Sequence, residues 1–221
     1  NVPQQLSKIR DIEKRKVYNL AFLAFLDSMG YAKRVKKSNH KELFKKVLKR
    51  YVKTVEDVLE NPYFDNKNLG TMKILNKSTA QNLELKEDSI DGIITSPPYS
   101  FAIDYVKNDQ YQLEFLGYNA DVLKDNMIGL SGKNKAERIN NYFNDMSNVC
   151  SEIHRVLKKG KYFVMIIGSN TNQTGGIRLE RKIIDSCEDL GLRLIKSILK
   201  PIKGIRNTMK DEFVLFFQKQ N

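Results

Sequence analysis

Residues 90–99 read Ile-Asp-Gly-Ile-Ile-Thr-Ser-Pro-Pro-Tyr, an apolar run that stops at two prolines. The run Ile90–Thr95 is short, rich in β-branched residues and typical of a buried strand. Each proline that follows lacks a backbone N–H, so a central strand cannot continue through the pair. We therefore expect the strand to end there, with Ser96 at its carboxyl edge.

The segments around this strand alternate between strand and helix patterns, which indicates an α/β sheet. Further strands are expected over Thr71–Leu75, Tyr162–Ile167, Leu192–Ile198 and Glu212–Gln218, and helices over Ile103–Leu116, Ala136–Leu157 and Arg178–Leu190. The last two strands should pair antiparallel, because the connection Leu199–Asp211 is too short for a helical crossover. Asn119–Asn134 is polar and turn-rich, and Lys158-Lys159-Gly160 is typical of a basic last turn and glycine cap.

The first sixty residues predict helices instead. Apolar residues recur there at three- to five-residue steps, and Ser28-Met29-Gly30 predicts a break between two helices. The second helix is expected from Asn39 to Glu60, with one apolar face and one basic face. We therefore divide the chain into a basic helical segment, residues 1–66, and an α/β region, residues 67–221.

The composition limits the class of protein. A chain of 221 residues with 41% hydrophobic residues is expected to form one principal core. No run of about 18 apolar residues predicts a membrane span, so no membrane partner is expected. Cys150 and Cys187 belong to no Cys-x-x-Cys pair and stand at no metal-ligand spacing, which favours a reduced, cytoplasmic protein.

The net charge of +12 is unevenly placed. Residues 1–53 hold fifteen Lys or Arg and four acids, an excess of +11. Such a block suits a polyanion such as DNA, because each neutralised phosphate releases counterions. A solvated helix face without a partner is the alternative interpretation.

Thr95-Ser96-Pro97-Pro98-Tyr99 resembles the catalytic motif of amino-methylating DNA methyltransferases, which read Ser-Pro-Pro-Tyr or Asp-Pro-Pro-Tyr after a strand. The resemblance extends into Asp104-Tyr105 and into Leu157–Gly168, which looks like the helix end, glycine turn and fifth strand of that fold. It implies an α/β fold: a Rossmann-like methyltransferase sheet, incomplete and mostly parallel with a C-terminal antiparallel hairpin, plus an N-terminal helical segment. The alternative is a proline-stiffened turn with a packing tyrosine.

The resemblance also implies roles for these residues. In the family's mechanism, the hydroxyl that matches Ser96 and the carbonyl of Pro97 accept hydrogen bonds from the base amino group and localise its lone pair. The two prolines hold that carbonyl by fixing φ, and the tyrosine stacks on a base flipped out of the duplex. Catalytic roles are thus implied for Ser96, Pro97, Pro98 and Tyr99, substrate contacts for Asp104 and Tyr105, and no metal. For Asp104 and Tyr105, a helix-start charge and a packing aromatic are alternatives.

The family takes its methyl group from S-adenosylmethionine, which it binds with a glycine-rich turn after its first strand. The sequence holds no such turn, and what matches the rest of a cofactor site is Ser78, Thr79 and Thr95. Three explanations stay open: a fragment whose upstream segment carries the glycine motif, one subunit of a split enzyme, or a degenerate, non-catalytic member. We favour an upstream segment or second chain, which predicts weak cofactor binding by this chain alone.

The leading hypothesis is a site-specific DNA methyltransferase of a modification or restriction-modification system. Serine at position 96 favours the N4 group of cytosine, whereas aspartate is more usual for N6 of adenine, and adenine stays open. One rival is a non-catalytic DNA-binding subunit of a split methyltransferase, indicated by the missing glycine turn and the basic block. Another is an RNA amino-methyltransferase, since these also use a Pro-Pro-Tyr motif.

Overall fold

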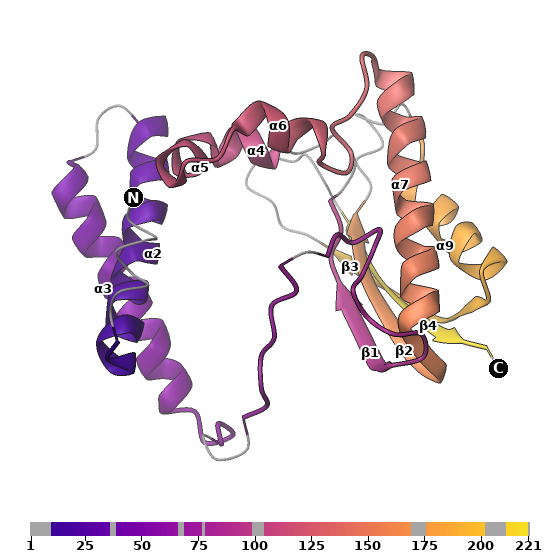
Figure 1. The fold of residues 1–221 in the computed structure, drawn as a ribbon, viewed down its shortest axis with the longest axis horizontal. Coiled ribbons are helices and arrows are strands. Elements are labelled where there is room, and N and C mark those ends of the chain that lie inside the picture. Colours follow the sequence, from indigo (N-terminus) through magenta and orange to yellow (C-terminus); the bar gives the residue numbers. More distant parts are fainter. Residues whose placement is uncertain are drawn as a thin grey trace. The chain divides into compact units, whose positions relative to one another are not determined.

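The computed structural model describes residues 10–35, 39–65, 69–76, 78–98, 104–168, 176–201 and 211–220, which form two compact units (Figure 1). The helical unit comprises Asn1–Met72 and Tyr105–Leu123, and the sheet unit comprises Lys73–Asp104 and Lys124–Asn221. Our division at residue 66 assigned residues 105–123 to the α/β region, whereas these residues pack with the helical unit.

Two long helices in the helical unit begin at polar caps. α2 (Ile12–Arg34) follows Asp11, whose carboxylate accepts hydrogen bonds from two backbone N–H groups of the first turn. α3 (His40–Leu59) follows Asn39, whose side-chain oxygen does the same. Such caps satisfy N–H groups that the first turn of a helix leaves without partners. The helix predicted from Asn39 to Glu60 is thereby confirmed.

α2 runs through Ser28-Met29-Gly30 without interruption, so the predicted break was wrong. The Ser28 hydroxyl donates a hydrogen bond to the carbonyl of Phe25, one turn earlier. Gly30 lies against the side chain of Gln112 in α5 (Gln110–Leu116), and a Cβ at position 30 would collide with that side chain. The glycine therefore lets another helix approach instead of ending its own.

Short helices replace the single helix expected over Ile103–Leu116. α4 (Tyr105–Asn108) and α5 are separated by Asp109, and Ile103 lies outside the described residues. α6 (Ala120–Asp125) crosses the boundary between the units and occupies part of the stretch that was expected to be turns.

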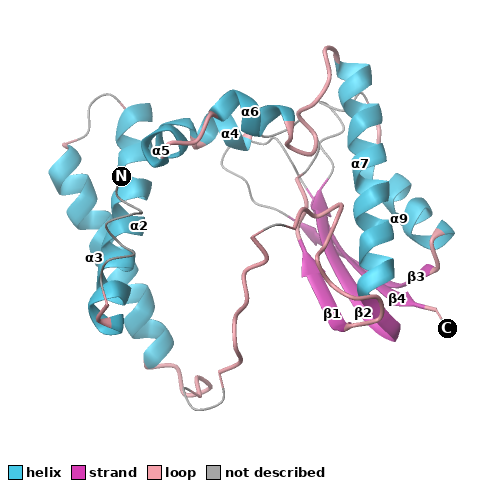
Figure 2. Cartoon of the chain, viewed as in Figure 1, coloured by secondary structure: helices cyan, strands magenta, loops and turns pink. Residues whose placement is uncertain are grey.

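The sheet unit contains four strands in the order β1-β2-β4-β3 (Figure 2). β1 (Ile90–Thr95) pairs in parallel with β2 (Leu157–Gly168). β4 (Asp211–Lys219) pairs antiparallel with β2 on one side and with β3 (Leu192–Pro201) on the other. The α/β architecture and the antiparallel pairing of the last two strands are thus confirmed. In the described sheet, β1 and β2 pair in parallel, and the other neighbouring strands pair antiparallel.

α7 (Lys135–Val156) and α9 (Leu179–Asp189) cover the same face of this sheet. Alternate residues of β2 point toward them and are fully buried, namely Phe163, Met165 and Ile167. The thiols of Cys150 in α7 and Cys187 in α9 are buried where the two helices meet, with their sulfurs 3.2 Å apart. Removal of this apolar surface from water is the main force that stabilises the unit.

The opposite face of the sheet has no helix against it among the described residues of this unit. Its central side chains are apolar and only half-buried, namely Val164, Ile166, Val214 and Phe216. Ile94 of β1 is 80% exposed, and within the described part of the chain β1 has a paired strand on one side only. Parallel strands usually lie beneath helices on both faces. Within the described residues of the sheet unit, one apolar face and one edge of β1 therefore have no covering element.

The strand predicted over Thr71–Leu75 was wrong. These residues have no regular structure, and the side chains of Met72 and Ile74 are 87% and 70% exposed. An apolar pattern becomes a strand only where another strand offers hydrogen-bond partners, and none of the described strands lies beside this segment.

The helix predicted to reach Leu157 ends at Val156, and the stretch Lys158-Lys159-Gly160 belongs to β2 instead of capping the helix. The Lys158 ammonium lies 2.9 Å from both carboxylate oxygens of Asp91 in β1. Gly160 has a φ of 72° where the register between β1 and β2 shifts. The positive φ of Gly160 thus accommodates the shift in register, and the ion pair between Lys158 and Asp91 links β2 to β1.

Candidate active site

The Ser-Pro-Pro turn lies at the carboxyl edge of β1, where the sequence predicted it. Thr95 is half-buried and stands opposite Met165 of β2 in the parallel ladder. Ser96 follows directly and is exposed, Pro97 is buried and Pro98 is half-buried. The rigid pair therefore packs into the unit while the serine remains accessible at the edge of the sheet.

Tyr142 of α7 holds this turn in place. Its side chain is fully buried, and its hydroxyl donates a hydrogen bond to the carbonyl oxygen of Pro98 at 3.0 Å. A buried phenol needs a hydrogen-bond partner, and this one ties the end of β1 to the middle of a long helix. Sequence analysis missed Tyr142. Its place in the apolar stripe of α7 could be predicted, but not the group that its hydroxyl meets.

Part of the predicted site lies outside the described residues. This holds for Tyr99, which follows the turn.

Asp104 and Tyr105 are neighbours in sequence but belong to different units. The carboxylate of Asp104 is half-buried in the sheet unit and lies 3.1 Å from the ammonium of Lys124. Tyr105 begins α4 in the helical unit, and 38% of its surface is exposed. The structure therefore joins Asp104 to the same unit as Ser96, and Tyr105 to the other.

Ser78 and Thr79 lie in a polar turn of the connection that leads to β1. The Ser78 hydroxyl accepts a hydrogen bond from the backbone N–H of Glu84 at 2.8 Å. Thr79 exchanges two backbone hydrogen bonds with Asn82. Two of the three predicted cofactor residues thus shape their own turn.

Two charged residues of α7 fix this connection to the helix. The Arg155 guanidinium donates hydrogen bonds to the carbonyls of Leu85 at 2.9 Å and Leu83 at 3.0 Å. It also pairs with Glu152 at 2.8 Å, and Glu152 accepts the N–H of Leu83 at 2.9 Å. The hydrogen bond from Arg155, followed by that from Leu83, lowers the pKa of Glu152 to about 2. The approach to β1 is therefore held by charge-assisted hydrogen bonds.

A buried lysine holds the start of β1 at the other end. The Lys219 ammonium, near the end of β4, donates to Asp88 at 2.8 Å and to the carbonyls of His154 and Leu157 at 2.7 and 2.9 Å. Three acceptors satisfy the charge, which is what allows a lysine to be buried. The hydrogen bond from Lys219 also lowers the pKa of Asp88.

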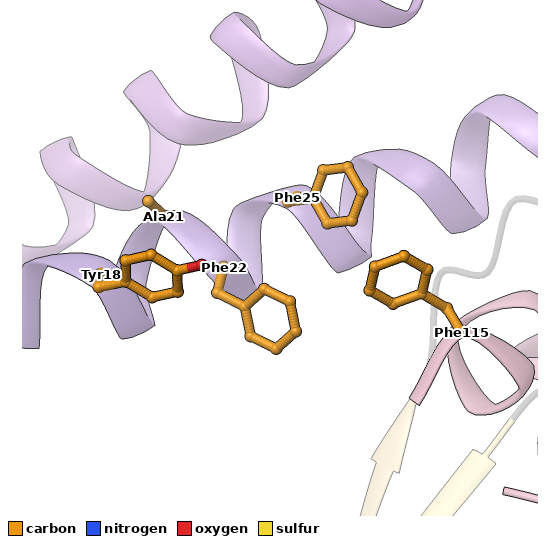
Figure 3. A pocket seen from close by; sticks show the side chains of 5 residues that line it. All are labelled: Tyr18, Ala21, Phe22, Phe25 and Phe115. Carbon is orange, nitrogen blue, oxygen red and sulfur yellow. The ribbon is translucent and has the colours of Figure 1, made fainter. Parts of the chain in front are cut away.

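The helical unit contains an apolar pocket of about 360 Å³ (Figure 3). It is lined by Tyr18, Ala21, Phe22, Phe25 and Phe115. The rings of Phe25 and Phe115 lie 5.4 Å apart between their centroids, which joins α2 to α5. None of the site residues predicted from the sequence lines this pocket.

Metal-ligating clusters and membrane spans are both absent from the described ranges. No group of three or more His, Cys, Asp or Glu side chains comes together there in a way that could hold a metal ion. Nor does any helix in those ranges combine the length and the apolar character that crossing a membrane requires.

Comparison with known proteins places the turn within a family. A family model described as DNA methylase matches residues 90–221, which begin at the first residue of β1 and make up more than half of the chain. No curated protein sequence matches the chain significantly.

Solved structures with low similarity to the chain were also found. One is a proposed DNA modification methylase of Thermus thermophilus, with 18% identity and a TM-score of 0.39 over 62% of this chain and 48% of that one. The same protein in complex with S-adenosyl-L-methionine gives 18% identity and a TM-score of 0.38 over 62% and 49%. Another is an S-adenosylmethionine-dependent methyltransferase of Methanosarcina mazei, with 14% identity and a TM-score of 0.42 over 77% and 78%. The chain spans about half the length of the Thermus protein.

Proposed function

We propose that this chain, which belongs to the DNA methylase family, supplies the catalytic turn of an S-adenosylmethionine-dependent enzyme that methylates an exocyclic amino group of a DNA base. The observation that carries the proposal is the Ser96-Pro97-Pro98 turn, exposed at its serine and clamped by Tyr142. Ligands of open α/β sheets bind outside the carboxyl ends of the strands, and the turn lies at such an end.

The chemistry needs two fixed hydrogen-bond acceptors. The amino nitrogen of cytosine or adenine is a poor nucleophile, because its lone pair is delocalised into the ring. The Ser96 hydroxyl and the Pro97 carbonyl would accept hydrogen bonds from its two N–H groups and localise that pair. The Pro97 carbonyl is the acceptor that the family resemblance implies, and the Pro98 carbonyl accepts from Tyr142 instead. Tyr99 would stack on the flipped base. Most of the rate enhancement would then come from positioning and electrostatics.

S-adenosylmethionine, when bound, supplies a methyl group on a sulfonium. This chain fits only part of a site for it. Thr95 adjoins the turn, whereas Ser78 and Thr79 are engaged in their own connection, and the sequence holds no glycine-rich turn. We infer that Ser78, Thr79 and Thr95 hold the cofactor together with a further segment that carries the glycine turn. Asp104, in the same unit as the turn, remains our candidate for substrate contact, together with Tyr105.

The open edge of β1 and the uncovered sheet face are where such a segment would sit. Ile94 at that edge is largely exposed, and the neighbouring β2 side chains are apolar and half-buried. An unpaired strand edge offers its backbone donors and acceptors to another strand. The segment is either an upstream part of the same polypeptide or a partner chain, and both arrangements would cover the apolar face.

Calorimetry tests the shared cofactor site. S-adenosylmethionine titrated into this chain alone is expected to bind weakly or not at all. The same titration after the glycine-turn segment is supplied, either fused upstream or as a separate chain, is expected to show binding. Ile94→Lys in this chain should weaken that restored binding by placing a charge on the open edge, whereas Leu199→Lys, at an exposed position of β3, should not. Tight binding by the unaccompanied chain would contradict the proposal.

We further propose N4 of cytosine as the acceptor, in a modification or restriction-modification system of the cytoplasm. The support is the serine at position 96, where aspartate is more usual for N6 of adenine. Mass spectrometry of nucleosides from DNA treated with the completed enzyme is expected to find N4-methylcytosine. N6-methyladenine as the only product would refute the preference for cytosine, and methylation of RNA alone would refute DNA as substrate.

A non-catalytic DNA-binding subunit is the second candidate. The excess of +11 in residues 1–53 and the missing glycine turn favour it. It predicts salt-sensitive DNA binding and no methyl transfer, whichever partner is added. Methylation by any reconstituted complex that depends on Ser96 excludes it.

A further inference from the structure

We propose that Lys45, Lys46 and Lys49 of α3 form a ridge that contacts the phosphates of the DNA duplex on which the enzyme acts. These three residues are called the α3 ridge. The choice of DNA as the polyanion rests on the proposed function, whereas the ridge itself follows from the geometry and charge of the helix.

The ridge lies outside the packed face of α3. Val47 is buried, and Phe44 and Tyr51 beside it are half-buried. With 3.6 residues per turn, Lys45 and Lys49 fall on the opposite side of the helix and Lys46 on its flank, and all three are exposed. Lys45 and Lys49 are one turn apart, a rise of about 6 Å along the axis. The three ammonium groups therefore form a short row at the surface of the helical unit.

The ridge places like charges side by side on α3. Among the described residues, none of the three lysines forms an ion pair within 4.0 Å. Lys49 has Lys45, Lys46 and Lys53 as its neighbours three and four positions away, and like charges at these spacings destabilise a helix. Lys53 is neutralised by Asp57 at 2.9 Å, which marks the end of the row. A surface that serves solubility alone mixes both signs, so this row favours an external anion.

The arrangement fits an extended polyanion better than a small one. The ridge lies on an exposed helix surface, and the pockets described in the helical unit take in only one of its residues, Lys46. A row of flexible cations on such a surface can follow the repeated phosphates of a nucleic-acid backbone. Contacts to phosphates do not distinguish one base from another. The ridge therefore gives affinity and position on the duplex, while sequence recognition falls to other residues.

The salt dependence of DNA binding by the full chain tests this inference. Fluorescence anisotropy with a labelled duplex, over a series of KCl concentrations, compares the unmodified chain with the triple variant Lys45→Gln, Lys46→Gln and Lys49→Gln. Glutamine keeps the helix propensity of lysine. The matched control, Arg181→Gln, Arg193→Gln and Lys196→Gln, removes the same three charges from exposed positions of the sheet unit. Circular dichroism checks that all variants fold.

The ridge variant is expected to bind at least tenfold more weakly at low salt. The slope of log Kd against log salt should fall by about two to three, because each lost phosphate contact contributes about 0.9. The control should change the slope by less than about one. Replacing the three lysines with arginine should restore both affinity and slope.

Equal losses in the ridge variant and the control would overturn the inference, since net charge alone would then explain them. So would an unchanged slope in the ridge variant, and this result leaves the proposed methyltransferase intact as long as the chain still binds DNA. The inference would also be overturned if the ridge variant lost binding to phosphatidylserine vesicles and kept its full affinity for DNA. The ridge would then bind a membrane surface. If the unmodified chain binds no DNA even at low salt, both the ridge and the DNA substrate of the proposed function fail.

Discussion

The sheet unit and the helical unit differ in where they place apolar and charged side chains. In the sheet unit the apolar residues of β2, β4, α7 and α9 form one buried core, and key cations have partners, as Lys219 has in Asp88 and Arg155 in Glu152. In the helical unit α2 leaves Val17 and Leu23 69% and 54% exposed, and the α3 ridge has no ion pair within the described residues.

This difference indicates that the two units have different roles. Packing and matched charges fix the position of a group to a fraction of an ångström, which a catalytic turn needs. A helix pair that exposes cations and apolar side chains is better suited to binding other molecules. We therefore expect substitutions in the sheet unit to affect turnover and stability, and substitutions on the helical surface to affect binding.

The largest expected effect is on turnover. Ser96→Ala removes one of the two proposed acceptors, and loss of one preorganised hydrogen-bonding group at a reaction centre typically lowers kcat by about 10²- to 10³-fold. DNA affinity should change little, because the charges proposed to bind DNA lie elsewhere. Single-turnover methyl transfer by the completed enzyme measures the first effect and anisotropy the second. The control is Ser147→Ala, at an exposed position of α7; a turnover loss as large as that of Ser96→Ala would break the comparison.

The next effect is on stability. Met146→Ala, at a position that is 1% exposed in α7, should lower the free energy of unfolding by about 2–5 kcal/mol, because it removes buried surface and leaves a cavity. Val55→Ala in α3, at a position that is 44% exposed, should change it by less than about 0.5 kcal/mol. Urea unfolding followed by circular dichroism compares the two. Similar losses would show that α3 is packed as tightly as the sheet unit.

Tyr142→Phe should have a smaller effect that separates positioning from packing. The substitution keeps the ring but removes the donor to the carbonyl of half-buried Pro98, which costs about 0.5–1.5 kcal/mol. If the bond also positions the turn, kcat should fall while KM stays constant. The control is Tyr118→Phe, at an exposed position of the helical unit. A variant that loses stability but keeps its kcat would restrict Tyr142 to a structural role.

The smallest effect concerns pH. The pKa of Glu152 is lowered from its ordinary value of 4.5 to about 2, so its ion pair stabilises the folded state above pH 4.5 and this contribution is lost as the pH falls toward 2. Glu152→Gln should therefore lower the melting temperature at pH 7 but flatten its decline between pH 5 and pH 2. Differential scanning calorimetry measures both curves. Parallel curves would mean that Glu152 does not contribute through its charge.

Local patterns in the sequence were sufficient for the elements that depend on near neighbours. The end of β1 was predicted because two prolines forbid a strand from continuing, and α3 was predicted from its amphipathic stripe. Predictions failed where a distant partner decides. No described strand pairs with Thr71–Leu75, and Gly30 accommodates Gln112 instead of breaking α2. Lys158 finds Asp91 across the sheet instead of ending α7.

The roles of the site residues divide in the same way. The Ser-Pro-Pro-Tyr motif was visible in the sequence because its chemistry lies in four consecutive residues. The clamp on that motif was not visible, because Pro98 and Tyr142, 44 positions apart, are brought together only by the packing of α7 against the sheet.

By itself, then, the sequence determined the α/β class, the edge at which the turn lies and the basic character of the N-terminal helices, since periodicity, proline geometry and charge act over short distances. Only the tertiary structure decided which face of the sheet is covered, which unit holds residues 105–123 and what restrains the turn. These features depend on contacts between residues far apart in the chain, and such contacts leave no local pattern.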